Sequence, residues 1–265
     1  MFHRSIKTKK SVLPNTASTD FSLEPYGGMG CLKVVGQNSQ TQSLVTAELQ
    51  SQIVADGYSL AEISDINDEI DYRYTSFLTK ITLKRCIFKY IDEIHTTLLS
   101  EEEIDGLPVA LSAELYDAVA WMSSPIASDY SQNNVSSYPK KKFTVLPTVH
   151  MKDVPLEPYG GWGVIRVLGM TFSVQSEITA ELQGRVVADG YNLAEIKERQ
   201  KEIDSKYMST LITITLKRCT MLFDQNLRPR LLTEDEVLNL PVDLASDLYM
   251  VVGELSSPPD LNVPM

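Results

Sequence analysis

Apolar residues recur at helical spacing in two corresponding stretches of the chain. Residues 42–56 place one apolar stripe along a helix, formed by Leu44, Val45, Leu49, Ile53 and Val54. Residues 175–189 repeat the stripe with Ile178, Leu182, Val186 and Val187. A glycine follows each stretch, Gly57 or Gly190, and glycine suits the left-handed residue that ends many helices. The pattern predicts an amphipathic helix in each half of the chain.

A second helix follows each of these. Ser59 and Asn192 suit its N-cap, because a short side-chain oxygen accepts from the free N–H groups of the first turn. The helix continues with apolar residues at helical spacing, but residues 79–87 and 212–220 are rich in β-branched residues and also fit a strand. We favour one long helix and leave the strand open.

Shorter elements complete each half. Residues 31–36 and 164–169 are β-prone runs that end at a glycine, and each predicts a short strand. Residues 1–22 form a basic arm with one extended piece at residues 11–13. Near the end of each half, a capped acidic turn leads through Leu-Pro into an apolar helix over residues 109–122 and 242–255.

The halves share more than a pattern. Residues 23–28, Leu-Glu-Pro-Tyr-Gly-Gly, recur unchanged at residues 156–161, an offset of 133 residues (156 − 23). At the same offset Val-Leu-Pro of residues 12–14 returns at residues 145–147. From residue 23 to 125, about half of the positions match without a gap. Gene duplication explains this.

The sequence therefore predicts a mainly α protein with short β elements. Two tandem homologous helical modules are expected, each with an N-terminal arm and a short strand. The first spans residues 1–125 and the second residues 142–265, with a Ser/Asn-rich linker at residues 126–141. Duplicated modules pack pseudo-symmetrically or bind equivalent sites on one partner, and a homo-oligomer is a further alternative.

The glycine-rich motif carries the candidate site. No Lys-Ser/Thr follows the glycines, so a phosphate loop is not predicted, and positive-φ turns are the simpler role. The bulky side chains beside glycines either anchor a protein partner or cover the module's own core. The candidate partner-binding residues are Tyr26, Met29, Tyr58, Tyr159, Trp162 and Tyr191.

Composition and charge disfavour several classes of function. A net charge of −11 disfavours binding to nucleic acid or to anionic membranes. The sequence contains no apolar run of about 18 residues, so no transmembrane span is predicted. Three cysteines and three histidines form no symmetric metal or catalytic set. We therefore expect no cofactor, no metal and no enzymatic activity, and a cytoplasmic location.

A family resemblance supplies a hypothesis. Residues 232–245, Leu-Thr-Glu-Asp-Glu-Val-Leu-Asn-Leu-Pro-Val-Asp-Leu-Ala, resemble the helix-Leu-Pro-helix segment of bacteriophage tail assembly chaperones. This implies an acidic, helical protein that keeps tail-tube and tape-measure subunits soluble. A structural virion component, such as a connector, tail or decoration subunit, is the alternative. An enzyme with a small-molecule pocket at Tyr-Gly-Gly is a third.

Overall fold

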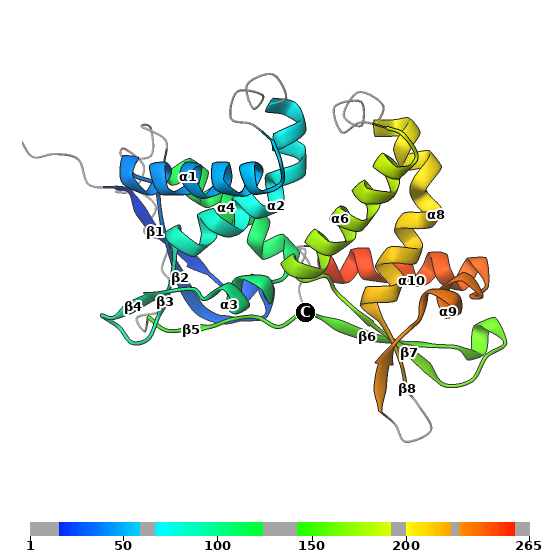
Figure 1. The fold of residues 1–265 in the computed structure, drawn as a ribbon. Helices are drawn as coiled ribbons and strands as arrows, with labels where there is room; N and C mark the ends of the chain where they lie inside the picture. The colour runs from blue at the N-terminus through cyan, green and yellow to red at the C-terminus, as the bar shows by residue number, and fades with distance from the viewer. Residues whose placement is uncertain (1–15, 59–66, 124–141, 192–199, 224–227, 258–265) are drawn as a thin grey trace, which may run out of the picture.

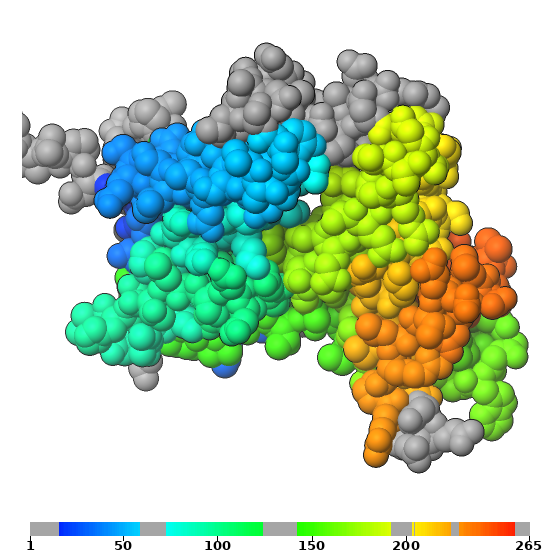
Figure 2. All heavy atoms as spheres, in the orientation of Figure 1, coloured from blue at the N-terminus to red at the C-terminus, as the bar shows by residue number. Residues whose placement is uncertain are grey.

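The computed structural model describes residues 16–58, 67–123, 142–191, 200–223 and 228–257 (Figure 1). Within these ranges the chain forms eight α-helices and two small antiparallel sheets, so the protein is mixed α/β with a helical majority. Figure 2 shows two lobes side by side, one from each half of the chain.

The first half has one sheet with strand order β1-β2-β3-β4, all antiparallel. Helices α1 and α2 follow β2, and α3 and α4 follow β4. The elements are β1 (Ser18–Ser22), η1 (Glu24–Tyr26), β2 (Met29–Val35), α1 (Ser39–Ala55), α2 (Asn67–Cys86), β3 (Ile87–Tyr90), β4 (Thr96–Leu98), α3 (Glu101–Asp105) and α4 (Val109–Met122).

The second half repeats this order of elements, with sheet order β6-β7-β8-β9. Between the halves lies β5 (Thr144–Val145), which belongs to the first sheet. The elements are β6 (Met151–Pro155), η2 (Glu157–Tyr159), β7 (Val164–Leu168), α6 (Phe172–Ala188), α8 (Gln200–Cys219), β8 (Thr220–Phe223), β9 (Pro229–Leu231), α9 (Glu234–Leu238) and α10 (Val242–Ser256).

The predicted first helices are confirmed. The Asn38 side chain accepts from the Thr41 N–H at 2.8 Å at the start of α1, and Thr171 caps α6 in the same way. Gly57 follows α1 with φ +98°, and Gly190 follows α6 with φ +94°. Glycine therefore ends both helices in the left-handed conformation, as the sequence predicts.

The segments 79–87 and 212–220 are helical almost to their ends. Helix α2 runs to Cys86 and α8 to Cys219, and a strand begins at the next residue of each. The favoured long helix is thus confirmed as far as these cysteines. The predicted N-caps Ser59 and Asn192 lie outside the described residues, as do the linker 126–141 and the extended piece at 11–13.

The predicted short strands are confirmed as β2 and β7, but each half contributes four strands to a sheet instead of the one expected. The arm's last residues form β1, and the short strands after α2 and α8 were not predicted. Strand β3 holds only four residues and is defined by pairing with β2, from which more than 50 residues separate it. Local patterning carries little signal for such a strand.

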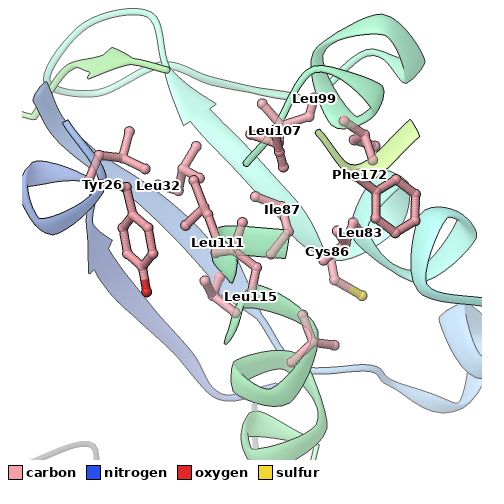
Figure 3. Packing of buried hydrophobic residues seen from close by; sticks show 14 of the residues in the cluster. Tyr26, Leu32, Leu83, Cys86, Ile87, Leu99, Leu107, Leu111, Leu115 and Phe172 are labelled. Carbon is pink, nitrogen blue, oxygen red and sulfur yellow. The ribbon is translucent and has the colours of Figure 1, made fainter. Parts of the chain in front are cut away.

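Each half has its own core, and the first core includes a residue from the second half. Phe172, the first residue of α6, is 7% exposed and packs in the first core (Figure 3). Its N–H donates to the Leu107 carbonyl oxygen at 2.9 Å, and the Val109 N–H donates to the Met170 carbonyl oxygen at 3.2 Å. The start of α6 is therefore fastened to the α3–α4 corner of the first half.

Candidate subunit-binding edge

The first sheet is extended by a segment that follows the linker. We call residues 142–147 the connecting arm, and residues 28–31 the first edge. In the arm, Val145 lies opposite Met29 and Thr144 opposite Gly30, antiparallel to β2. The Cys31 N–H donates to the Phe143 carbonyl oxygen at 3.0 Å. The arm thus continues the hydrogen-bonded ladder beyond the place where β3 ends.

Two side chains of the arm fix its register. The Thr144 hydroxyl donates to the Cys31 carbonyl oxygen at 2.6 Å and accepts from the Tyr90 N–H at 2.8 Å. Lys142 pairs with Asp20 at 2.9 Å and lies 5.2 Å from the centre of the Tyr90 ring. Because β-strand register follows such specific pairs, the arm can occupy the first edge in one alignment only.

The glycines of the first edge make room for the arm. A methyl group on Gly28 would lie 2.8 Å from the Val145 carbonyl oxygen and 3.1 Å from Cδ of Pro147. A methyl group on Gly30 would overlap the carbonyl oxygen of Phe143. Glycine is therefore required here for close approach of two backbones, in addition to the positive φ of Gly30.

The corresponding residues of the second half, 161–164, form what we call the second edge. Its glycines are retained at Gly161 and Gly163, yet a methyl group on Gly163 would meet no atom within 4 Å among the described residues. Trp162 is 95% exposed. Both Gly28 and Gly30 are buried, whereas their counterparts are exposed. The second edge is thus open where the first edge is covered.

The second core is open at the same place. A hollow beside the second edge is lined on its apolar side by Leu156, Ile165, Leu222, Leu232 and Leu240. In the first half, Leu146 of the connecting arm packs against a core that includes Leu23 and Leu107. Both of these leucines are fully buried, while their counterparts Leu156 and Leu240 are only partly buried. An apolar side chain supplied from outside would fill the hollow.

The candidate residues of the repeated motif have different surroundings. Tyr26 is 5% exposed and hydrogen-bonds to Glu114, so its ring packs in its own core. Tyr159 is partly buried and donates to Asp247. Met29 is 55% exposed, even with the arm beside it. Together with Trp162, these residues mark the equivalent edges of the two sheets.

Tyr58 and Tyr191 lie away from these edges. Arg73 donates to the Tyr58 hydroxyl at 2.8 Å and lies 5.5 Å from its ring centre. Lys206 lies 4.8 Å from the ring centre of Tyr191. Each tyrosine thus joins the end of one helix to the next helix by a cation–π contact. The sequence analysis grouped these tyrosines with the residues of the glycine motif, but the structure places them at the joints between helices instead.

The cysteines are poorly suited to chemistry. Burial raises the pKa of the Cys86 thiol to about 11 and the pKa of Cys219 to about 12. These thiols are therefore protonated at neutral pH and behave as small apolar side chains. The described ranges contain no group of three or more His, Cys, Asp or Glu side chains that could hold a metal ion.

The signal for the connecting arm is present in the sequence, since Val-Leu-Pro of residues 12–14 recurs at residues 145–147, but the sequence does not show where the arm binds.

Every helix of the described part is too short or too polar to cross a lipid bilayer. Comparisons with family models, curated proteins and solved structures gave no match to this chain.

Proposed function

We propose that this chain is a non-enzymatic assembly protein of the bacteriophage type, whose partners are other protein subunits. Its two halves are proposed to be duplicated modules that present equivalent edges. The observation that carries the proposal is the second edge, where a sheet strand, an exposed tryptophan and a leucine-lined hollow lie together.

The proposal follows from how the first edge is used. A segment from another part of the chain adds a strand to β2 and inserts an apolar side chain into the core. Adding a strand to a sheet edge is a common way to bind an extended segment of a protein, because main-chain hydrogen bonds give affinity and side-chain pockets give specificity. An equivalent open edge suits the same mode of binding.

Two roles fit this chemistry. A tail assembly chaperone would hold tube or tape-measure subunits transiently, in keeping with the acidic charge and the Leu-Pro unit. A structural virion component would keep its contacts permanently. The strand-addition joint between the halves favours this second role, since main-chain pairing joins rigid modules into a fixed geometry.

Co-expression with the tail-tube and tape-measure subunits of the same phage genome tests the proposal. We expect a soluble complex with at least one of them, or the chain itself in finished particles. Trp162→Asp should weaken either association. A matched control is Met250→Asp, at a residue 61% exposed on α10, which should bind normally. A chain that binds neither subunit and is absent from the particle would refute this function.

A further inference from the structure

We propose that the second edge binds residues 9–14 of a second copy of this chain, so that copies join head to tail. This inference rests on the proposed function in one respect, the use of the second edge for binding protein, and it names the partner. It begins from the intramolecular case, in which the connecting arm occupies the first edge.

The sequence of the proposed ligand matches the connecting arm. Residues 9–14 read Lys-Lys-Ser-Val-Leu-Pro, and residues 142–147 read Lys-Phe-Thr-Val-Leu-Pro, at the same offset of 133 (142 − 9). Residues 9–14 retain three side-chain types of the connecting arm. These are the lysine that pairs with Asp20, the hydroxyl that fixes the register and the leucine that packs against the core. The one large change is Lys10 in place of Phe143.

The receiving groups are retained as well. Asp153 stands where the first half has Asp20, and the Phe223 ring stands where it has Tyr90. Both now contact Arg166, at 2.7 Å from Asp153 and 4.9 Å from the Phe223 ring centre. An arriving Lys9 would therefore share this carboxylate and this aromatic ring with Arg166, whereas Lys142 meets Asp20 and Tyr90 without such a neighbour among the described residues.

The remaining positions also fit. Ser11 would take the place of Thr144, with the Phe223 N–H as donor and the Val164 carbonyl oxygen as acceptor. Leu13 would enter the hollow that Leu156 and Leu240 line. Gly161 and Gly163 leave the space that two closely paired backbones need. The open space lies above Gly163, since a methyl group on Gly161 would approach Cβ of Leu156 at 3.0 Å.

The ligand must come from another copy. Residue 14 lies three residues before Ala17, and three residues of extended chain span at most about 11 Å. Figure 1 shows β1, which begins at Ser18, and β7 at opposite ends of the molecule. A chain cannot reach its own second edge over that separation, so each copy offers one donor segment and one acceptor edge. Such a heterologous contact makes rings or open filaments.

The intermolecular joint differs from the intramolecular one at α1. Phe172, which fastens α6 to the first core, has Ser39 as its counterpart. The contact between copies would consequently depend on the donated segment, without a second apolar anchor. We expect a joint that depends on protein concentration.

Analytical ultracentrifugation of the full chain over a wide concentration range tests the inference. The wild-type mass should rise above 29.6 kDa with concentration. Leu13→Asp should require at least about tenfold higher concentration for the same mass, because a buried leucine contributes that much to affinity. Ser5→Asp, which changes charge outside the matched segment, should behave as wild type. A synthetic peptide of residues 7–16 should dissociate the assembly, and its Leu13→Asp form should not.

Site-specific cross-linking tests the register. Val145 lies opposite Met29, so Val12 should lie opposite Trp162. Mixing a Val12→Cys chain with a Trp162→Cys chain should give a disulfide-linked dimer under oxidising conditions. Mixing Val12→Cys with Glu157→Cys, which lies outside the predicted pairing, should give none.

A mass that stays at that of one chain, or that Leu13→Asp leaves unchanged, would overturn the inference, as would a failure of the Val12→Cys and Trp162→Cys pair to cross-link. The two proposals can fail separately. If the wild-type chain is monomeric and binds tail subunits, and Trp162→Asp loses that binding, the proposed function stands and self-association is rejected. Self-assembly without any phage-subunit partner would do the reverse.

Discussion

At the scale of single residues, the glycines show how one sequence feature has two environments. Gly30 and Gly163 are counterparts with nearly equal φ, +80° and +83°. The first has the backbone of Phe143 against its α-carbon, whereas the second has no described atom within 4 Å of the place that a β-carbon would take. Positive φ alone would require glycine at both, so only a comparison of the two isolates the close approach.

We predict that Gly30→Ala destabilises the protein more than Gly163→Ala. Each should lose about 1–2 kcal/mol because alanine is strained at positive φ. Gly30→Ala should lose about 1–3 kcal/mol more, because the arm must move away from the new methyl group. Urea unfolding at a concentration where the chain is monomeric measures the difference. Equal losses would show that the arm does not approach Gly30 closely in solution.

At the scale of elements, the acidic turn at α9 is fixed by its charges. The Thr233 side chain accepts from the Glu236 N–H at 3.3 Å, and the Glu236 carboxylate accepts from the Thr233 N–H at 2.9 Å. Arg230 on β9 donates to the same carboxylate at 2.7 Å. These contacts lower the pKa of Glu236 to about 2, with the Arg230 hydrogen bond as the largest cause.

We predict that Glu236→Gln lowers stability in a pH-dependent way. The folded pKa is below the unfolded value of about 4.3, so the ionised carboxylate stabilises the fold above that value. The advantage of the wild type should be largest above about pH 5 and should vanish as pH falls through about 2. Glutamine keeps the capping geometry, which isolates the charge.

Urea midpoints of both proteins over this pH range provide the measurement. Asp235→Asn is the matched control, since it removes a charge from the same turn and leaves the Arg230–Glu236 pair intact. A difference between wild type and Glu236→Gln that is constant with pH would contradict the assigned role of Arg230.

At the scale of the whole molecule, the connecting arm and Phe172 both join the described parts of the two halves. The connecting arm completes the first sheet, and Phe172 enters the first core from the start of α6. The arm lies beside β2 and Phe172 lies at the α3–α4 corner, and both pack against the same core. Both contacts therefore stabilise the association of the two halves.

We predict that Phe172→Ala loosens this joint. Loss of a buried phenylalanine ring should destabilise the first half by about 3 kcal/mol. Hydrogen exchange should accelerate at the Val109 and Phe172 amides, whose hydrogen bonds cross the joint. Ser39→Ala, at the counterpart position, should leave stability unchanged within about 0.5 kcal/mol. Unchanged exchange in Phe172→Ala would show that the halves are held by the arm alone.

Sequence reasoning located helices and selected candidate binding residues, but it did not separate the candidates that lie at sheet edges from those that join helices. It identified Trp162 and Met29 beside glycines, and both are exposed at sheet edges. It also grouped Tyr58 and Tyr191 with them, although these join helices through Arg73 and Lys206. Proximity in the repeat did not distinguish the two groups, because residues repeated together need not lie together in space.

The sequence by itself determined the glycines that end the first helices, the capped acidic turns and the repeated motif, because these depend on residues a few positions apart. Only the tertiary structure decided the strand pairing of the two sheets and the place of the connecting arm, because strand pairing joins residues distant along the chain. The tripeptide Val-Leu-Pro occurs twice in the sequence. That residues 145–147 bind beside Met29, and leave an equivalent edge open at Trp162, follows from packing alone.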